Sequence, residues 1–94
     1  MVRIVAKLQV KKGSKEKFIQ LAKELIIKSQ EEEGCIDYHL FQSQSDENTV
    51  TFIEAWKDMK AIESHNASIH FTTIFPKLGE LLEETDVTLY DVIN

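Results

Sequence analysis

Two polar residues on one predicted strand are the first candidates for chemistry. Glu54 and Trp56 are two residues apart in the segment 49–57, and alternate side chains of a strand share a face, which here also carries Phe52. Burying a carboxylate without a partner costs free energy. Glu54 is therefore either a pocket residue that bonds a substrate or orients a histidine, or an edge residue paired with a lysine. Trp56 either packs in the core or offers its indole N–H to a substrate oxygen.

The third candidate is His65, nine residues after Trp56 at the end of a predicted short helix. A helix C-terminus favours the protonated imidazole, and histidine exchanges protons near neutral pH. His65 is thus either a proton-transfer residue or a surface histidine that caps the helix.

The remaining candidates carry weaker signals. His39 shares a predicted strand face with Asp37, opposite Tyr38, and His70 falls in the first turn of a predicted helix. Tyr38 either packs or presents its hydroxyl to a pocket. No His-x-x-x-His or similar pair is present, so we predict no metal site. The single cysteine, Cys35, is more typical of a small buried side chain than of a nucleophile.

Changes in hydrophobic periodicity define the elements that must position these residues. The predicted order is strand 2–10, a helix from Lys15 to Gly34, strands 35–43 and 49–57, helix 58–65, a helix from Ser68 to about Leu82, and strand 86–93. This is the βαββαβ order of an α+β ferredoxin-like fold, with a four-stranded antiparallel sheet and helices on one face. We expect one domain over residues 1–94.

The helix ends have their own signals. Ser14 and Ser68 are predicted N-caps, and Gly34 suits a left-handed C-cap. Pro76 is expected to kink or restart the last helix because proline cannot donate the helical hydrogen bond.

The predicted sheet is apolar on both faces. The third strand places Phe52 and Trp56 on one face and Ile53 and Ala55 on the other. The predicted helices can cover only one face, and a large exposed apolar patch calls for a partner. We therefore expect a homodimer that packs sheet against sheet around a two-fold axis.

Composition excludes several classes of function. The chain has 11 basic and 16 acidic residues, a net charge of −5, and no basic stripe interleaved with aromatic residues, so nucleic-acid binding is not expected. No apolar run approaches the roughly 20 residues of a membrane span. Without a signal-peptide pattern, and with one cysteine, the chain is expected to be cytoplasmic.

Three ordered motifs carry a resemblance to a known family. They are Glu32-Glu33-Gly34-Cys35-Ile36-Asp37-Tyr38, Glu54-Ala55-Trp56, and His65-Asn66-Ala67-Ser68-Ile69-His70-Phe71. In order and spacing they resemble the antibiotic biosynthesis monooxygenase family, which includes quinol monooxygenases. That family forms dimeric α+β barrels with a pocket between the sheet and the helices of each protomer.

The resemblance implies a monooxygenase that acts on a quinol or another hydroxylated aromatic molecule with O2 and without a metal, flavin or other cofactor. His65 is then the candidate general base and Glu54 its catalytic companion. The residues implied in substrate binding are Trp56, Tyr38, Phe52 and Phe71.

Other branches of the family imply alternatives. One is an isomerase of a small polyhydroxylated metabolite, and another is a non-catalytic dimer that binds a small molecule. The haem-degrading branch uses an asparagine and a histidine at positions that fall near Ala6 and Phe75 here. Neither side chain can replace them, so the resemblance argues against haem degradation.

Overall fold

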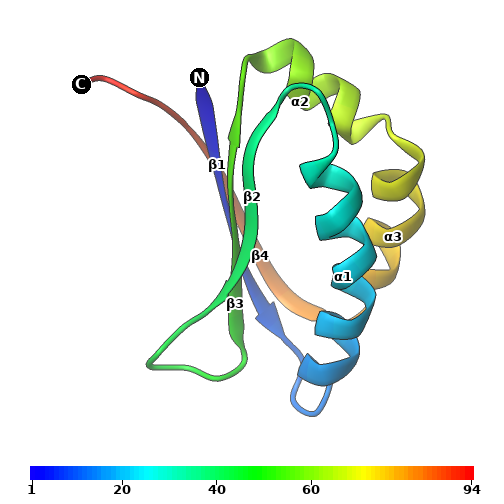
Figure 1. Cartoon of the computed structure of the whole chain (residues 1–94). Helices are drawn as coiled ribbons and strands as arrows, with labels where there is room; N and C mark the ends of the chain where they lie inside the picture. The colour runs from blue at the N-terminus through cyan, green and yellow to red at the C-terminus, as the bar shows by residue number, and fades with distance from the viewer.

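Four antiparallel strands form one sheet in the order β2-β3-β1-β4, with all the helices against one face (Figure 1). The computed structural model describes all 94 residues. Its elements are β1 (Val2–Val10), α1 (Lys15–Gln30), β2 (Cys35–Gln42), β3 (Thr49–Trp56), α2 (Met59–Asn66), α3 (Ile69–Gly79) and β4 (Leu82–Asp91). The predicted α+β ferredoxin-like fold is confirmed.

The register of the sheet decides which side chains face the helices. Val2, Ile4, Ala6, Leu8 and Val10 alternate with more exposed residues along β1, and all five are buried. Ile4 lies opposite Glu54 of β3, and Glu54 in turn lies opposite Tyr38 of β2. Because paired residues project from the same face of a sheet, Glu54 points towards the helices.

The apolar stripe of α1 closes the core over this inner face. Phe18, Ala22 and Leu25 follow helical spacing, and all three are fully buried. The phenyl rings of Phe18 and Phe52 lie 6.3 Å apart, which joins the helix to the centre of the sheet. None of the helices has the length and apolar content that crossing a bilayer requires.

Side-chain caps fix the starts of the two short helices. Asp58 accepts a hydrogen bond from the backbone N–H of Ala61, and Ser68 accepts one from Phe71. The predicted cap at Ser68 is confirmed, whereas Ser14 makes no side-chain cap bond. Ala67 and Ser68 alone separate α2 from α3, so His65 and His70 are held close together.

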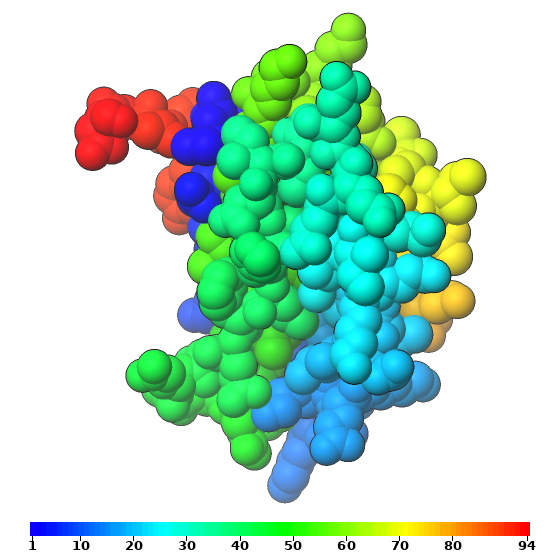
Figure 2. Space-filling model, in the orientation of Figure 1, coloured from blue at the N-terminus to red at the C-terminus, as the bar shows by residue number.

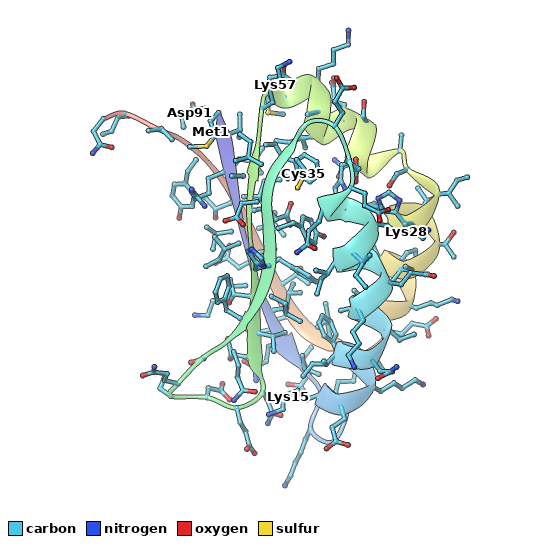
Figure 3. All side chains as sticks on the ribbon, in the orientation of Figure 1. Met1, Lys15, Lys28, Cys35, Lys57 and Asp91 are labelled. Atoms are coloured by element: carbon cyan, nitrogen blue, oxygen red, sulfur yellow. The ribbon has the colours of Figure 1, made fainter.

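Gly34 has a different role from the one predicted. Helix α1 ends at Gln30, and the only glycine with a positive φ angle is Gly13, so a left-handed cap at Gly34 was wrong. Instead, a Cβ atom on Gly34 would lie 2.3 Å from the Cβ of Ala61 in α2. The Gly34 carbonyl also accepts a hydrogen bond from Lys57 N–H. Glycine is therefore required for close packing where β2 begins beside the end of β3 (Figure 3, near Cys35 and Lys57).

Replacing Gly34 with alanine should destabilise the protein by about 1–3 kcal/mol, the usual cost of overpacking. Ala61→Gly should recover part of this loss, because it removes the atom that the new methyl group meets. Urea unfolding of the two single variants and the double variant measures the coupling. Gly79→Ala is the control, since its methyl group meets nothing within 4 Å. Strictly additive losses in the double variant would contradict the steric explanation.

The end of the chain also departs from prediction. Helix α3 runs through Pro76 to Gly79, so of the predicted kink or restart the restart is wrong, and β4 begins at Leu82, four residues earlier than expected. Leu82 is thus a strand residue, because the helix has already ended at Gly79. All residues of β4 after Leu82 are exposed. Residues 92–94 follow the strand and project from the body of the molecule (Figure 2).

Candidate active site

An apolar cavity of about 460 Å³ lies between the inner face of the sheet and helices α2 and α3. Eight of its 11 lining residues are hydrophobic, and its volume falls within the range of small-molecule sites. The lining residues are Ile4, Ala6, Glu54, Met59, Ile62, His65, Asn66, Phe71, Phe75, Val87 and Leu89. The cavity therefore combines an apolar wall with one carboxyl group, one imidazole and one carboxamide.

Glu54 is almost completely buried, with 6% of its surface exposed. Its Oε1 accepts a hydrogen bond of 2.8 Å from the indole N–H of Trp56, two residues along β3. Burial raises the pKa of the Glu54 carboxyl to about 7, although the bond from Trp56 opposes this shift by stabilising the carboxylate. Near neutral pH, Glu54 therefore exchanges between acid and carboxylate and can give or take a proton.

His65 lies in the last turn of α2 inside an aromatic cage, with 2% of its surface exposed. Its ring centroid is 4.6 Å from that of Trp56, 4.9 Å from Phe71 and 5.4 Å from Tyr38. Burial lowers the pKa of His65, and this outweighs the opposing effect of Glu32. His65 is consequently neutral at neutral pH and can accept a proton.

Glu32, in the turn between α1 and β2, orients this imidazole. Its Oε2 lies 2.6 Å from His65 Nδ1 and 2.8 Å from His70 Nε2. An ionised carboxylate only accepts hydrogen bonds, so both histidines donate to it. Neutral His65 therefore carries its proton on Nδ1, which leaves the lone pair of Nε2 available. A carboxylate that fixes the tautomer of a histidine is a common arrangement for a general base.

The predicted site residues divide into two groups. Glu54, His65 and Phe71 line the cavity. Tyr38, Phe52 and Trp56 are at most 2% exposed and are absent from its lining. The Tyr38 ring packs 5.5 Å from Phe52 and 6.1 Å from Trp56, so these three side chains form the support behind the cavity. Their direct contact with a substrate remains a prediction that this geometry does not favour.

Two weaker candidates lie outside the cavity. His39 is exposed on the opposite face of the sheet, where its Nε2 lies 2.7 Å from Asp37. It is thus separated from His65 and His70. Cys35 is half-buried, and burial together with the nearby Glu32 carboxylate raises its thiol pKa to about 11. The thiol therefore stays protonated and is a poor nucleophile.

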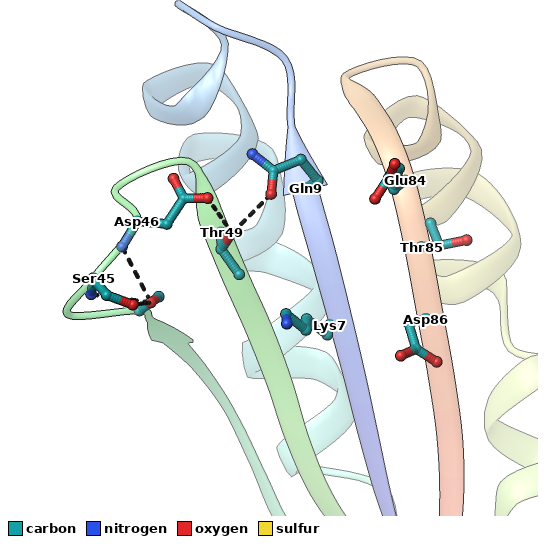
Figure 4. Close-up of a pocket in the computed structure, with 9 residues that line it drawn as sticks. Lys7, Gln9, Ser45, Asp46, Thr49, Glu84, Thr85 and Asp86 are labelled. Carbon is teal, nitrogen blue, oxygen red and sulfur yellow. Dashed lines mark hydrogen bonds between the residues drawn. The ribbon is translucent and has the colours of Figure 1, made fainter.

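A second hollow lies on the outer face of the sheet, beside the β2–β3 loop (Figure 4). None of its nine lining residues is hydrophobic, and they include Lys7, Asp46, Glu84 and Asp86. Water can solvate such a surface without a ligand. The inner cavity, which contains both proton-exchanging groups, is the better candidate for an aromatic substrate.

Comparison with the sequence patterns of known families decides which family the chain belongs to. The model of the family described as "Antibiotic biosynthesis monooxygenase" matches residues 1–77. The chain belongs to the antibiotic biosynthesis monooxygenase family. This agrees with the resemblance drawn from the motifs around Gly34, Glu54 and His65.

Individual relatives support the family assignment. YcnE of Bacillus subtilis (strain 168), provisionally named a monooxygenase, is 38% identical over 82 residues, which cover 87% of this chain and 86% of that protein. A solved structure of a conserved protein from Methanosarcina mazei Go1 is 42% identical with a TM-score of 0.92, and covers 95% of this chain and 89% of that one. A structure described as an antibiotic biosynthesis monooxygenase is 30% identical with a TM-score of 0.94 over the full length of both chains. The descriptions of the family and of two of these relatives refer to monooxygenases, and none of them specifies a substrate.

Glu32 is the site residue that sequence reasoning missed. It is the middle member of the run Glu31–Glu33, whose outer two residues are exposed. Its histidine partners are 33 and 38 residues away along the chain. The available signal was its place in the first family motif, immediately before Glu33-Gly34-Cys35.

Proposed function

We propose that this protein is a monooxygenase that oxygenates a quinol or a similar hydroxylated aromatic molecule without a metal or flavin. The observation that carries the proposal is the orientation of His65. Glu32 holds its Nδ1, and the ring borders an apolar cavity that also contains Glu54. A base and a carboxyl group thus meet at one apolar surface.

The cavity wall suits a flat aromatic ring. Phe71 and Phe75 stack with centroids 4.8 Å apart and planes within 13° of each other. Such a surface favours aromatic packing, and the apolar surroundings strengthen hydrogen bonds to a phenolic oxygen. The substrate's hydroxyl group lies towards His65 and Glu54, and its ring lies along Phe71.

The reaction begins with transfer of the phenolic proton to Nε2 of His65. The electron-rich anion then reduces O2, and a ring carbon that bears hydrogen forms a C–O bond. His65 returns its proton to the resulting peroxide. Loss of the ring C–H proton to a base and cleavage of the O–O bond release water, with Glu54 in its acid form supplying a proton to the departing oxygen. A quinol and O2 thereby give a hydroxyquinone and water.

Oxygen labelling tests this reaction directly. Hydroquinones and polyphenols with a free ring C–H are incubated with the protein under ¹⁸O2, and products are analysed by mass spectrometry. One labelled atom in the quinone product, with one O2 consumed per substrate, is expected. Spontaneous quinol oxidation leaves the quinone unlabelled, so it is distinguished. Failure to exceed the protein-free rate across the panel contradicts the proposal, and turnover without O2 would favour an isomerase.

We also propose that two chains pair through the outer face of the sheet. Val5 lies opposite Ile53 at the centre of this face, and the helices cover only the opposite face. Tyr90 on β4 adds an aromatic side chain that is 52% exposed. A second copy of the chain would bury these groups.

Analytical ultracentrifugation is expected to give twice the chain mass of 10.8 kDa. Ile53→Asp should shift the equilibrium towards a single chain, because pairing would bury two unpaired carboxylates. Asp86→Asn, on the polar part of the same face, serves as the control. A wild-type mass of 10.8 kDa at micromolar concentration would rule out the dimer.

A further inference from the structure

Glu32, His65 and His70 bring three metal-binding atoms within 4.8 Å of one another. We propose that this cluster binds one divalent transition-metal ion of the zinc class. The predicted lack of a metal site was based on the spacing of histidines along the chain. The fold instead unites two histidines from adjacent helices with a glutamate from a distant turn.

The donor set selects the kind of ion. Two imidazole nitrogens and one carboxylate oxygen, with a fourth position for water, form a common catalytic zinc arrangement. Imidazole suits Zn²⁺, Co²⁺, Ni²⁺ and Cu²⁺, whereas Mg²⁺ and Ca²⁺ prefer oxygen ligands. The site should therefore discriminate strongly against Mg²⁺ and Ca²⁺.

Two of the three ligand separations are already close to those that a bound ion requires. Oε2 of Glu32 already lies 2.6 Å and 2.8 Å from the two histidine nitrogens. A tetrahedral ion with ligand bonds of about 2.0–2.2 Å separates its ligand atoms by about 3.4 Å. To admit an ion, the Glu32 carboxylate must therefore move away from each of the two nitrogens by roughly 1 Å or less. Rotation of a glutamate side chain in a turn can provide this movement.

The cluster is also reachable from solvent. The side chains of Glu32 and His70 are 17% and 14% exposed, whereas His65 is 2% exposed. An ion can thus enter past Glu32 and His70, with His65 as the inner ligand. Water can complete the coordination from the exposed side.

Metal binding would act on the proposed general base. Coordination through Nδ1 requires a neutral His65 to carry its proton on Nε2, which reverses the tautomer set by Glu32. Nε2 then donates a proton and cannot accept one. A bound ion therefore inhibits proton abstraction in the cavity. This effect goes beyond the proposed reaction, which uses no metal.

Calorimetric titration with Zn²⁺ tests the site in protein freed of metal with a chelator. One ion per chain is expected at the cluster. His70→Asn and Glu32→Gln should each weaken this binding by about 100-fold or more, since even the loss of outer-shell partners costs 10–100-fold. His39→Asn is the matched control, because His39 also contacts a carboxylate but lies on the other face of the sheet. Circular dichroism verifies that each variant folds.

A second measurement uses the unmodified chain. Zn²⁺ should shift the NMR signals of the His65 and His70 rings and leave those of His39 unchanged, while millimolar Mg²⁺ should shift none of the three. The inference is overturned if no Zn²⁺ binds, if only the His39 signals move, or if His70→Asn binds as tightly as the wild type. These readouts need no turnover, so they stand apart from the test of the monooxygenase proposal.

Discussion

Replacing His65 with glutamine should slow oxygen-dependent turnover by about 10²- to 10⁴-fold, the usual contribution of a positioned base. Glutamine can still donate a hydrogen bond to Glu32, yet it cannot take a phenolic proton. The loss should appear mainly in kcat, because the apolar wall that binds the ring is unchanged. Steady-state oxygen consumption at saturating substrate measures it.

His39→Gln provides the matched control for this prediction. His39 also contacts a carboxylate, but it is exposed and lies away from the cavity, so its replacement should leave turnover unchanged. A more acidic phenol as substrate, already ionised at the assay pH, should partly restore the activity of His65→Gln because no proton must be removed. Equal turnover by wild type and His65→Gln on the same phenol would eliminate His65 as the base.

Glu54→Gln should make the protein more stable at alkaline pH. The pKa of Glu54 is raised from its ordinary value of 4.5 to about 7 by burial, so ionising it in the folded protein is unfavourable. The 2.5-unit difference corresponds to about 3 kcal/mol. Glutamine is never ionised, and its side-chain oxygen can still accept the bond from Trp56. The variant therefore removes the ionisation penalty while retaining the hydrogen bond.

The direction of the pH dependence follows from proton binding. Between pH 4.5 and about 7 the folded state holds the Glu54 proton more tightly than the unfolded state does. The contribution of Glu54 to the free energy of unfolding consequently falls as pH rises through this window and is constant above it. The free energy of unfolding of Glu54→Gln, relative to that of the wild type, should therefore rise by about 3 kcal/mol between pH 4.5 and pH 8.5.

Urea unfolding at several pH values, in buffer with a chelator, measures this gain. Other titrating groups are common to both proteins, so the difference between the two curves isolates Glu54. Glu24→Gln, on the exposed side of α1, is the surface control for the substitution. Parallel curves for wild type and Glu54→Gln would show that the Glu54 carboxyl is not perturbed by the fold.

Local patterns predicted the fold. The two-residue alternation of Ile4, Ala6, Leu8 and Val10 defined β1, and the helical spacing of Phe18, Ala22 and Leu25 defined α1. Such patterns record which face of each element is buried.

The ends of the helices were less predictable than their positions. The packing of Gly34 against Ala61 joins residues far apart in the chain, and local spacing contains no information about such contacts.

The candidate site was only partly predictable for the same reason. Strand alternation placed Glu54 on the inner face, but it could not separate the cavity-lining Glu54 from the fully buried Trp56 on that face. The position of each side chain relative to the cavity depends on how α2 and α3 cross the sheet. Depth within a core is set by neighbouring elements and not by the period of one strand.

The sequence by itself determined that Glu54 shares a strand face with Trp56, that His65 ends a short helix, and that the elements follow the βαββαβ order. Those features depend on residues close together in the chain. Only the tertiary structure decided that Glu32 contacts His65 and His70, and thereby which nitrogen of His65 is free. The hydrogen bonds of a carboxylate depend on distance in space and not along the chain. The fold brings the two histidines, which are 33 and 38 residues from Glu32 in the sequence, within hydrogen-bond distance of it.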